Sequence, residues 1–218
     1  MNMIEYIIKL MPALLEGTGM TLAIFSITLV ISLPLGLLVS LLRVSKNRVV
    51  AKAVEIYCWV MRGTPLLLQL MFVYYGLPAI SPSLTMPAFT CAIIAFSLNY
   101  TAYFVEIFRG GIESIEQGQL EAADVLGLSR YQTMRRIILP QAIKRVLPSL
   151  GNEVITLVKD TALVYTIAIH ELLRVTQIAA TRDFRSDAFI AAGVIYLLLT
   201  FVCTRLQKRV ENKFAYYR

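Results

Sequence analysis

A polar stripe interrupts one of the long apolar stretches of the sequence and offers groups that bind charge. It consists of Ser149, Glu153, Thr156 and Asp160, with Asn152 beside it. The spacing of i, i+4, i+7 and i+11 places the first four on one face of a helix, with two carboxylates about two turns apart. An unpaired charge at mid-membrane costs about 2.5 to 3.5 kcal/mol, so these groups need partners or a role. The stripe predicts either an internally paired network or a binding site.

A second polar line recurs at helical spacing further towards the N-terminus, formed by Asn99, Tyr103, Glu106 and Gly110. Asn99 lies deep in its apolar stretch and is a candidate site residue. Glu106 is one turn from Arg109, and this spacing favours an ion pair over a binding role.

Covalent chemistry has little support in the sequence. An intramembrane enzyme using Glu153, Lys159 and Asp160 is one alternative, and a scaffold in which Lys159 neutralises the stripe is another. His170 is the single histidine and has no metal-ligand spacing around it, so no metal site and no catalytic residue is expected. The sequence also lacks a phosphate-binding loop of the GxxxxGK[ST] type, so this chain is not expected to bind ATP in that manner.

The composition is that of an integral membrane protein. The chain of 218 residues is 57% hydrophobic with a mean hydropathy of +0.67, whereas soluble domains are roughly 45 to 50% apolar. The net charge of +7 is therefore interpreted through membrane topology and not through nucleic-acid binding. The cysteines show neither disulfide nor metal spacing.

Five transmembrane helices are predicted from the uncharged runs, each long enough for a hydrocarbon core that needs about 20 helical residues. They cover residues 17–42, 60–80, 87–108, 146–169 and 188–204. Residues 1–16 are too short and too charged to span, and an interfacial helix is expected there. The fold class is all-α and polytopic, in a single transmembrane domain over 1–218.

The distribution of basic residues orients these helices. Of the Lys and Arg residues, 16 fall on the side that carries 43–62, 109–145 and 205–218, and 4 fall on the other side. Basic residues accumulate on the cytoplasmic side, so the N-terminus is expected outside and the C-terminus inside.

The segment from Glu121 to Pro140 is a polar and basic island that this topology places in the cytoplasm. It predicts two short helices with a hinge at Gly127, because glycine adopts the left-handed conformation that ends a helix. Ser129 and Gln132 have the spacing of a capping box at the start of the second helix. Pro140 either ends that helix or opens the next one.

Seven residues of this island resemble the EAAxxxG, nine residues, IxLP signature of membrane subunits of binding-protein-dependent ABC importers. They are Glu121, Ala122, Ala123, Gly127, Ile137, Leu139 and Pro140. Arg62 to Gln69 likewise looks like the RGTPLLxQ stretch of polar amino acid permeases, and the likeness covers about residues 17–205. In that family the island forms the coupling helix that docks on the ATPase, which assigns coupling to Glu121, Ala122, Ala123, Gly127, Leu139 and Pro140.

The resemblance implies a multi-pass permease in the bacterial cytoplasmic membrane, surrounded by lipid. Its partners would be a second copy or a sister permease, an ABC ATPase dimer that binds ATP and Mg, and an extracytoplasmic amino-acid-binding protein. No cofactor is expected in this chain itself. The two carboxylates favour a basic amino acid over glutamine or glutamate, with substrate contacts from Asn99, Ser149, Asn152, Glu153, Thr156 and Asp160.

Overall fold

The structure, a computed structural model, describes residues 2–214, and every regular element in that range is helical. The α-helices are α1 (Met3–Arg43), α2 (Arg48–Gly63), α3 (Leu66–Met71), α4 (Leu77–Ile80), α5 (Ala88–Glu113), α6 (Gln117–Val125), α7 (Arg130–Thr133), α8 (Leu139–Asp160), α9 (Leu172–Asp183) and α10 (Asp187–Phe214). π-helical turns lie at Phe72–Gly76 and Met134–Ile138, and 3₁₀ turns lie at Pro82–Leu84 and Thr161–Ile167. The all-α prediction is confirmed for the described part of the chain.

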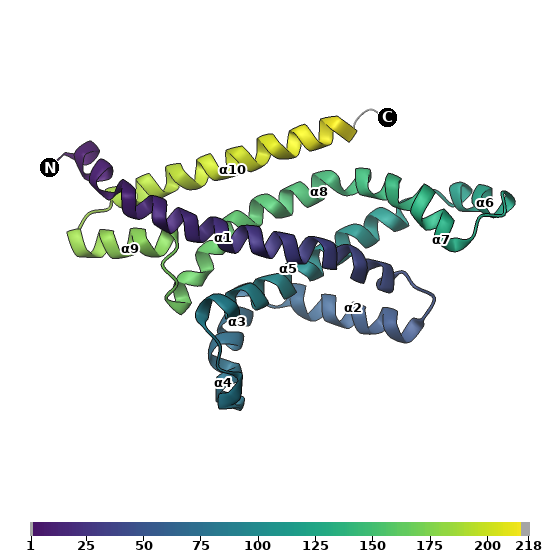
Figure 1. Cartoon of the computed structure of the whole chain (residues 1–218), viewed down its shortest axis with the longest axis horizontal. Helices are drawn as coiled ribbons and strands as arrows, with labels where there is room; N and C mark the ends of the chain where they lie inside the picture. The colour runs from purple at the N-terminus through teal and green to yellow at the C-terminus, as the bar shows by residue number, and fades with distance from the viewer. Residues whose placement is uncertain (1, 215–218) are drawn as a thin grey trace.

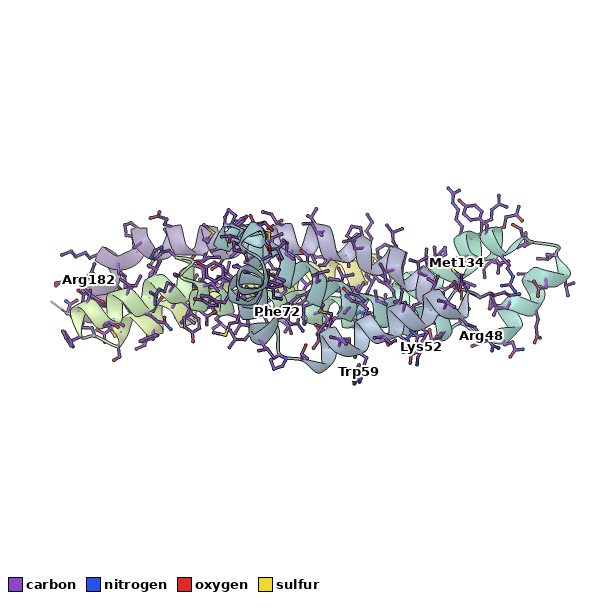
Figure 2. The ribbon with its side chains drawn as sticks, turned by 90° about the horizontal axis from the view of Figure 1, so that it is seen from below. Arg48, Lys52, Trp59, Phe72, Met134 and Arg182 are labelled. Carbon is purple, nitrogen blue, oxygen red and sulfur yellow. The ribbon has the colours of Figure 1, made fainter. Side chains whose placement is uncertain are left out.

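The long helices run lengthwise through an elongated molecule (Figure 1). The α9 helix lies at the end that carries the N-terminus, and α6 and α7 lie at the opposite end. The α3–α4 segment projects sideways from the middle of the molecule. Figure 2 shows the same separation in side view, with Arg182 of α9 at one end and Met134 near the other. This arrangement fits a protein whose long axis runs across a membrane.

The centre of the fold is the contact between α1 and α5. Small residues line the buried face of α1: Gly17, Thr21, Thr28, Ser32, Gly36 and Ser40. At Gly36 the backbone comes so close to α5 that a Cβ atom would lie 2.4 Å from the Cβ atom of Phe104. Small residues allow this close approach, which is the usual basis of helix packing where lipid offers no hydrophobic driving force.

Three helices of residues 2–214 are long and apolar enough to span a membrane alone, namely α1, α5 and α10. A fourth span results if α2 and Leu66–Ile80 are counted as one bent unit. The α8 helix, which covers most of the predicted span 146–169, does not belong to this set, because its charged residues lower its hydropathy. The count of five spans and their orientation therefore remain predictions.

The predicted span over 60–80 is not one straight helix, because the chain bends by 101° between Gly63 and Leu66, near the start of that stretch; its crossing of the membrane stays a prediction. Pro65 has no backbone N–H, and the residue before a proline is driven into the extended region. Thr64 accordingly has φ −117° and ψ 147°. The bend separates the first residues of the expected span, which end α2, from the projecting α3–α4 segment, which makes up the rest of it.

Two other expected boundaries differ from the structure. Residues 3–16 do not form a separate helix, because α1 continues through Pro12 without a break. Their interfacial position stays a prediction. The stretch 146–169 is an α-helix only to Asp160 and continues as a 3₁₀ turn that ends at Ala168 in the left-handed conformation.

Gly36→Ala is expected to destabilise the protein by about 1 to 3 kcal/mol, because the added methyl group overpacks the contact with Phe104. The matched control is Gly19→Ala on the same helix, where a Cβ atom would meet nothing within 4 Å. Thermal unfolding of the purified protein measures both. Equal melting temperatures for the two variants would show that the α1–α5 contact does not limit stability.

Candidate functional site

The break between α2 and α3 is held by two side-chain amides. The Nε2 atom of Gln69 donates to the Met61 carbonyl at 2.8 Å, to the Thr64 carbonyl at 3.2 Å and to Thr64 Oγ1 at 2.7 Å. The Nδ2 atom of Asn99 on α5 donates to the same Met61 carbonyl at 3.0 Å and to Gln69 Oε1 at 3.0 Å. The carbonyl groups freed by the break thus find donors inside the protein, as a non-helical backbone at membrane depth requires.

Arg62 is placed by this arrangement against the polar line of α5. Its guanidinium lies 5.4 Å from the ring centroid of Tyr103, and its Nη1 atom lies 3.6 Å from Glu106 Oε2. Arg109 also binds Glu106, with Nη2 at 2.8 Å and Nε at 3.0 Å. The predicted ion-pair role of Glu106 is confirmed, and it includes a second partner from α2.

The α8 helix brings the two carboxylates of the polar stripe to α5 in different environments. Asp160 Oδ2 accepts a hydrogen bond from the Tyr100 hydroxyl at 2.8 Å. Glu153 is half-buried and makes neither a hydrogen bond nor an ion pair with any residue of the described range. Lys159 is exposed and forms no ion pair with Asp160 in that range. Asp160 is therefore engaged by a hydroxyl, while Glu153 is half-buried and has no hydrogen-bond or ion-pair partner among the described residues.

The other predicted substrate residues are less available. Thr156 is half-buried and its hydroxyl donates to the Asn152 carbonyl at 3.1 Å, while Ser149 and Asn152 are exposed. Asn99 is 4% exposed, and both hydrogens of its amide are used at the break. A donor role of Asn99 towards a ligand stays a prediction and requires these bonds to open.

Three residues that the sequence did not single out for the site are brought to it by the structure: Arg62, Gln69 and Tyr100. Arg62 was visible as the charge that ends a basic run before a long apolar stretch. Tyr100 is on the α5 face next to Asn99, but a tyrosine in an apolar helix is usually a packing residue. Only the three-dimensional contact with Asp160 distinguishes it.

The hinge predicted at Gly127 is confirmed. Gly127 has φ +68°, and the N–H groups of Leu128 and Gly127 donate to the carbonyl groups of Ala123 and Asp124, each at 3.0 Å. This is the hydrogen-bond pattern in which glycine ends a helix. Ser129 then caps α7 with a complete capping box that includes Gln132, as expected.

The surface of this end of the molecule carries exposed apolar side chains. Val125, Leu126 and Tyr131 are 87%, 74% and 70% exposed. Glu121 and Ala122 are also exposed, whereas Ala123 is completely buried. Apolar side chains gathered on a polar segment mark a contact surface.

This surface is connected directly to the carboxylates. Pro140 does not end the second helix of the island but lies at the start of α8. The α7 helix, the π-helical turn Met134–Ile138 and α8 follow one another without a non-helical residue. Continuous helix thus joins α7 to the stretch that carries Glu153 and Asp160.

The opposite end of the molecule is ordered around α9. Glu171 is fully buried and caps this helix by accepting from the N–H groups of Leu173 at 2.7 Å and Arg174 at 2.6 Å. Hydrogen bonding from Arg182 lowers the pKa of Asp183 to about 2. Beside them is an open groove of about 950 Å³ whose lining includes Arg174, Gln177, Arg182, Phe184, Arg185 and Phe189. His170 is exposed, and residues 2–214 contain no cluster of His, Cys, Asp and Glu suited to a metal ion.

Residues 32–216 match the family described as "Binding-protein-dependent transport system inner membrane component". The chain is 41% identical over 95% of its length to the nopaline transport system permease protein NocM of Agrobacterium fabrum, of which it covers 90%. It is 40% identical over 93% of its length to the arginine transport system permease protein ArtQ of Bacillus subtilis, of which it covers 92%. It is 38% identical to the glutamine transport system permease protein GlnP of Escherichia coli, with 93% of each chain covered.

The structure is also similar to the crystal structure of an amino acid ABC transporter with histidines. The TM-score is 0.89 at 34% sequence identity, and the match covers 98% of this chain and 99% of the other. The break, the polar line of α5 and the polar stripe of α8 are thus set in a fold that a solved transporter shares.

Asn99→Asp is expected to destabilise the protein by about 1 to 3 kcal/mol, since aspartate has no amide hydrogens for Met61 and Gln69 and adds a buried charge. The matched control is Ser97→Ala on the same helix, because the Ser97 hydroxyl is buried without a partner. Thermal unfolding of the two purified variants measures the difference. If Asn99→Asp melts like the control, the amide does not hold the break.

Proposed function

Since this chain belongs to the inner membrane components of binding-protein-dependent transport systems, we propose that it forms the translocation pathway of an importer for basic amino acids. The chain is a permease subunit of an amino acid ABC importer. Membership of the family does not specify which amino acid is transported, because the relatives are named for nopaline, arginine and glutamine transport.

The chain is not an enzyme, because its relatives are permease subunits and the ATPase is a separate subunit. The alternative of intramembrane chemistry by Glu153, Lys159 and Asp160 is thereby excluded. The family implies an ATPase and a binding protein as partners. We place the chain in the bacterial inner membrane, paired with a second copy or a sister permease, with ATP and Mg held by the ATPase.

The observation that supports a basic substrate is that the Glu153 carboxylate has no partner in the described range. Its carboxylate is half-buried in an apolar molecule and finds no hydrogen bond or ion pair within residues 2–214. A charge left in that position is costly unless a cation joins it, and the attraction grows as water is excluded. The ammonium or guanidinium group of a basic amino acid supplies this cation. Asp160, engaged by Tyr100, contributes a second negative charge further along α8.

Glutamine is the second candidate, favoured by the similarity to a glutamine permease. A neutral side chain would leave Glu153 uncompensated, so this candidate requires that the carboxylate be protonated or bind the α-ammonium group. The two candidates differ in what removal of the charge does.

The coupling segment is the region that receives the movement of the ATPase in this proposal. Val125, Leu126 and Tyr131 offer apolar contacts, and the left-handed Gly127 fixes the angle between α6 and α7. Continuous helix from Arg130 to Asp160 then transmits the movement to Glu153 and Asp160, the two carboxylates that would bind the substrate. Access alternates between outside and inside as the ATPases close and open.

Glu153→Gln preserves the shape of the side chain and removes its charge. Uptake of arginine into vesicles containing the reconstituted importer should fall at least about 10-fold, because loss of one ion-pair partner in a desolvated site costs 2 kcal/mol or more. Uptake of any neutral amino acid that the system accepts should change much less. Glu55→Gln is the control, because this carboxylate lies on α2, is partly exposed and is paired with Arg43 and Lys52. An unchanged preference for arginine would place selectivity in the binding protein.

Gly127→Val should separate ATP hydrolysis from uptake while the protein stays folded. No neighbouring atom lies within 4 Å of a Cβ atom at this position, so the substitution acts through the backbone, which valine resists adopting at φ +68°. Gly127→Asn tolerates the left-handed conformation and should retain coupling. Hydrolysis and uptake are measured in the same vesicles. Normal coupling in the valine variant would contradict either the docking role or the hinge.

A further inference from the structure

The exposed side of α2 is apolar, although the helix begins among basic residues. Val49, Ile56 and Trp59 are 79%, 51% and 75% exposed. Val49 and Ile56 are seven residues apart and lie on one face of the helix, and Trp59 is one turn beyond Ile56. Figure 2 shows Trp59 on the same helix as Arg48 and Lys52. Exposed apolar side chains next to basic ones are typical of a helix that contacts a membrane interface.

Two apolar hollows lie where α2 passes α5. The first has a volume of about 400 Å³ and is enclosed by α1, α2 and α5, with Val39, Ala53 and Tyr57 in its lining. The second has a volume of about 560 Å³ and lies between the end of α2, α3 and α5. Leu98 lines both hollows, and the walls of both are almost entirely apolar. Small-molecule sites have volumes of about 300 to 1,000 Å³, so each hollow has room for a hydrocarbon chain.

The end of α1 and the start of α2 lie next to the first hollow and are basic. They and the turn between them carry Arg43, Lys46, Arg48 and Lys52. On α1, Arg43 is one turn beyond Val39, which lines the hollow. On α2, Lys52 directly precedes Ala53, which lines it from the other side. The hollow is therefore apolar along its length and basic at one end.

The positive charge at this end is only partly balanced. Glu55 is the acidic residue of the stretch 43–55, and it binds Arg43 at 3.1 Å and Lys52 at 2.8 Å. Lys46 and Arg48 are exposed and form neither an ion pair nor a side-chain hydrogen bond within residues 2–214. An anion at this end would therefore find two cations that no described side chain neutralises.

We propose that an anionic phospholipid binds at this place, with its phosphate at the basic end of α1 and α2 and an acyl chain in the first hollow. An acidic protein would match the charges but not the hollow, and a neutral lipid would match only the hollow. The topology expected from the basic residues puts this end in the cytoplasm, where the membrane leaflet carries anionic lipids that attract basic residues beside a transmembrane helix. The site goes beyond the proposed function, because it contains none of the residues assigned to the substrate or to the ATPase.

Trp59 is the single tryptophan of the chain, so its fluorescence reports which lipids lie beside α2. The full chain is reconstituted in phosphatidylcholine vesicles with increasing fractions of brominated phosphatidylglycerol, which quenches tryptophan at short range. Brominated phosphatidylcholine at the same fractions is the reference, and the ratio of the two binding constants gives the lipid preference. The natural sequence should prefer phosphatidylglycerol at least about 5-fold, since one basic residue near an anionic surface contributes about that factor.

Lys46→Gln combined with Arg48→Gln should lower this preference at least about 5-fold, because it removes the two unpaired cations. The matched control is Lys208→Gln combined with Arg209→Gln, which removes two exposed basic residues from α10 and should leave the preference unchanged. If both double variants lose the preference equally, general charge attraction explains it and the site is wrong. The absence of any preference in the natural sequence would also overturn the proposal.

Ala53→Phe tests the hollow itself. Ala53 is exposed, so the larger side chain fills the hollow without entering the core, and the preference for phosphatidylglycerol should fall. Ile56→Phe is the control, because Ile56 is exposed on the same helix and lines neither hollow. Equal preferences in these two variants would contradict the acyl-chain site. Light scattering of the purified variants covers the remaining outcome: if Ala53→Phe separates a dimer that Ile56→Phe keeps, a second copy of the chain occupies the hollow and the proposal is wrong.

Discussion

The amide of Asn99 satisfies the backbone where α2 ends and the chain bends, and it joins α2 to α5 at the place where Arg62 meets the polar line of α5. A backbone without helical hydrogen bonds survives at membrane depth only where protein groups replace them. Asn99 and Gln69 replace them at the Met61 carbonyl, and they join α2 to α5 in doing so. Arg62 follows directly in sequence, so the bond that closes the break also decides which face of α5 meets a guanidinium. The bend therefore also places Arg62 against α5.

The polar residues of the interior are divided between α5 and α8. Asn99 and Tyr103 belong to α5, which packs along α1 through small residues. Glu153 and Asp160 belong to α8, which is continuous with α7 at the end where exposed apolar side chains gather. In the function that we propose, a substrate between α5 and α8 would therefore contact a helix that reaches that surface.

Local signals in the sequence predicted the parts whose structure is set by neighbouring residues. The left-handed Gly127, the capping box of Ser129 and Gln132, and the ion pair of Glu106 depend on residues within four positions, and all three are confirmed. The bend at Gly63 was missed because the turn in this uncharged run was assigned to the later prolines Pro78, Pro82 and Pro87, and Pro65 was not taken as a helix boundary. The hydrogen bond between Tyr100 and Asp160 joins residues 60 positions apart, and no local pattern encodes such a pair. Long-range pairing of polar groups is what the sequence left open.

The helix that runs from α7 into α8 is not a regular α-helix throughout, because Met134–Ile138 form a π-helical turn. A π turn contains more residues than an α-helical turn, so the helix stores one surplus residue at this place. Each residue added to or removed from an α-helix rotates everything beyond it by about 100°. The surplus fixes the angle between the face that carries Tyr131 and the face that carries Glu153. If α7 contacts the ATPase as we propose, a permease with one residue fewer in this stretch would turn its Tyr131 face by about 100° relative to its Glu153 face, and so would present a different side of α7 to the same ATPase.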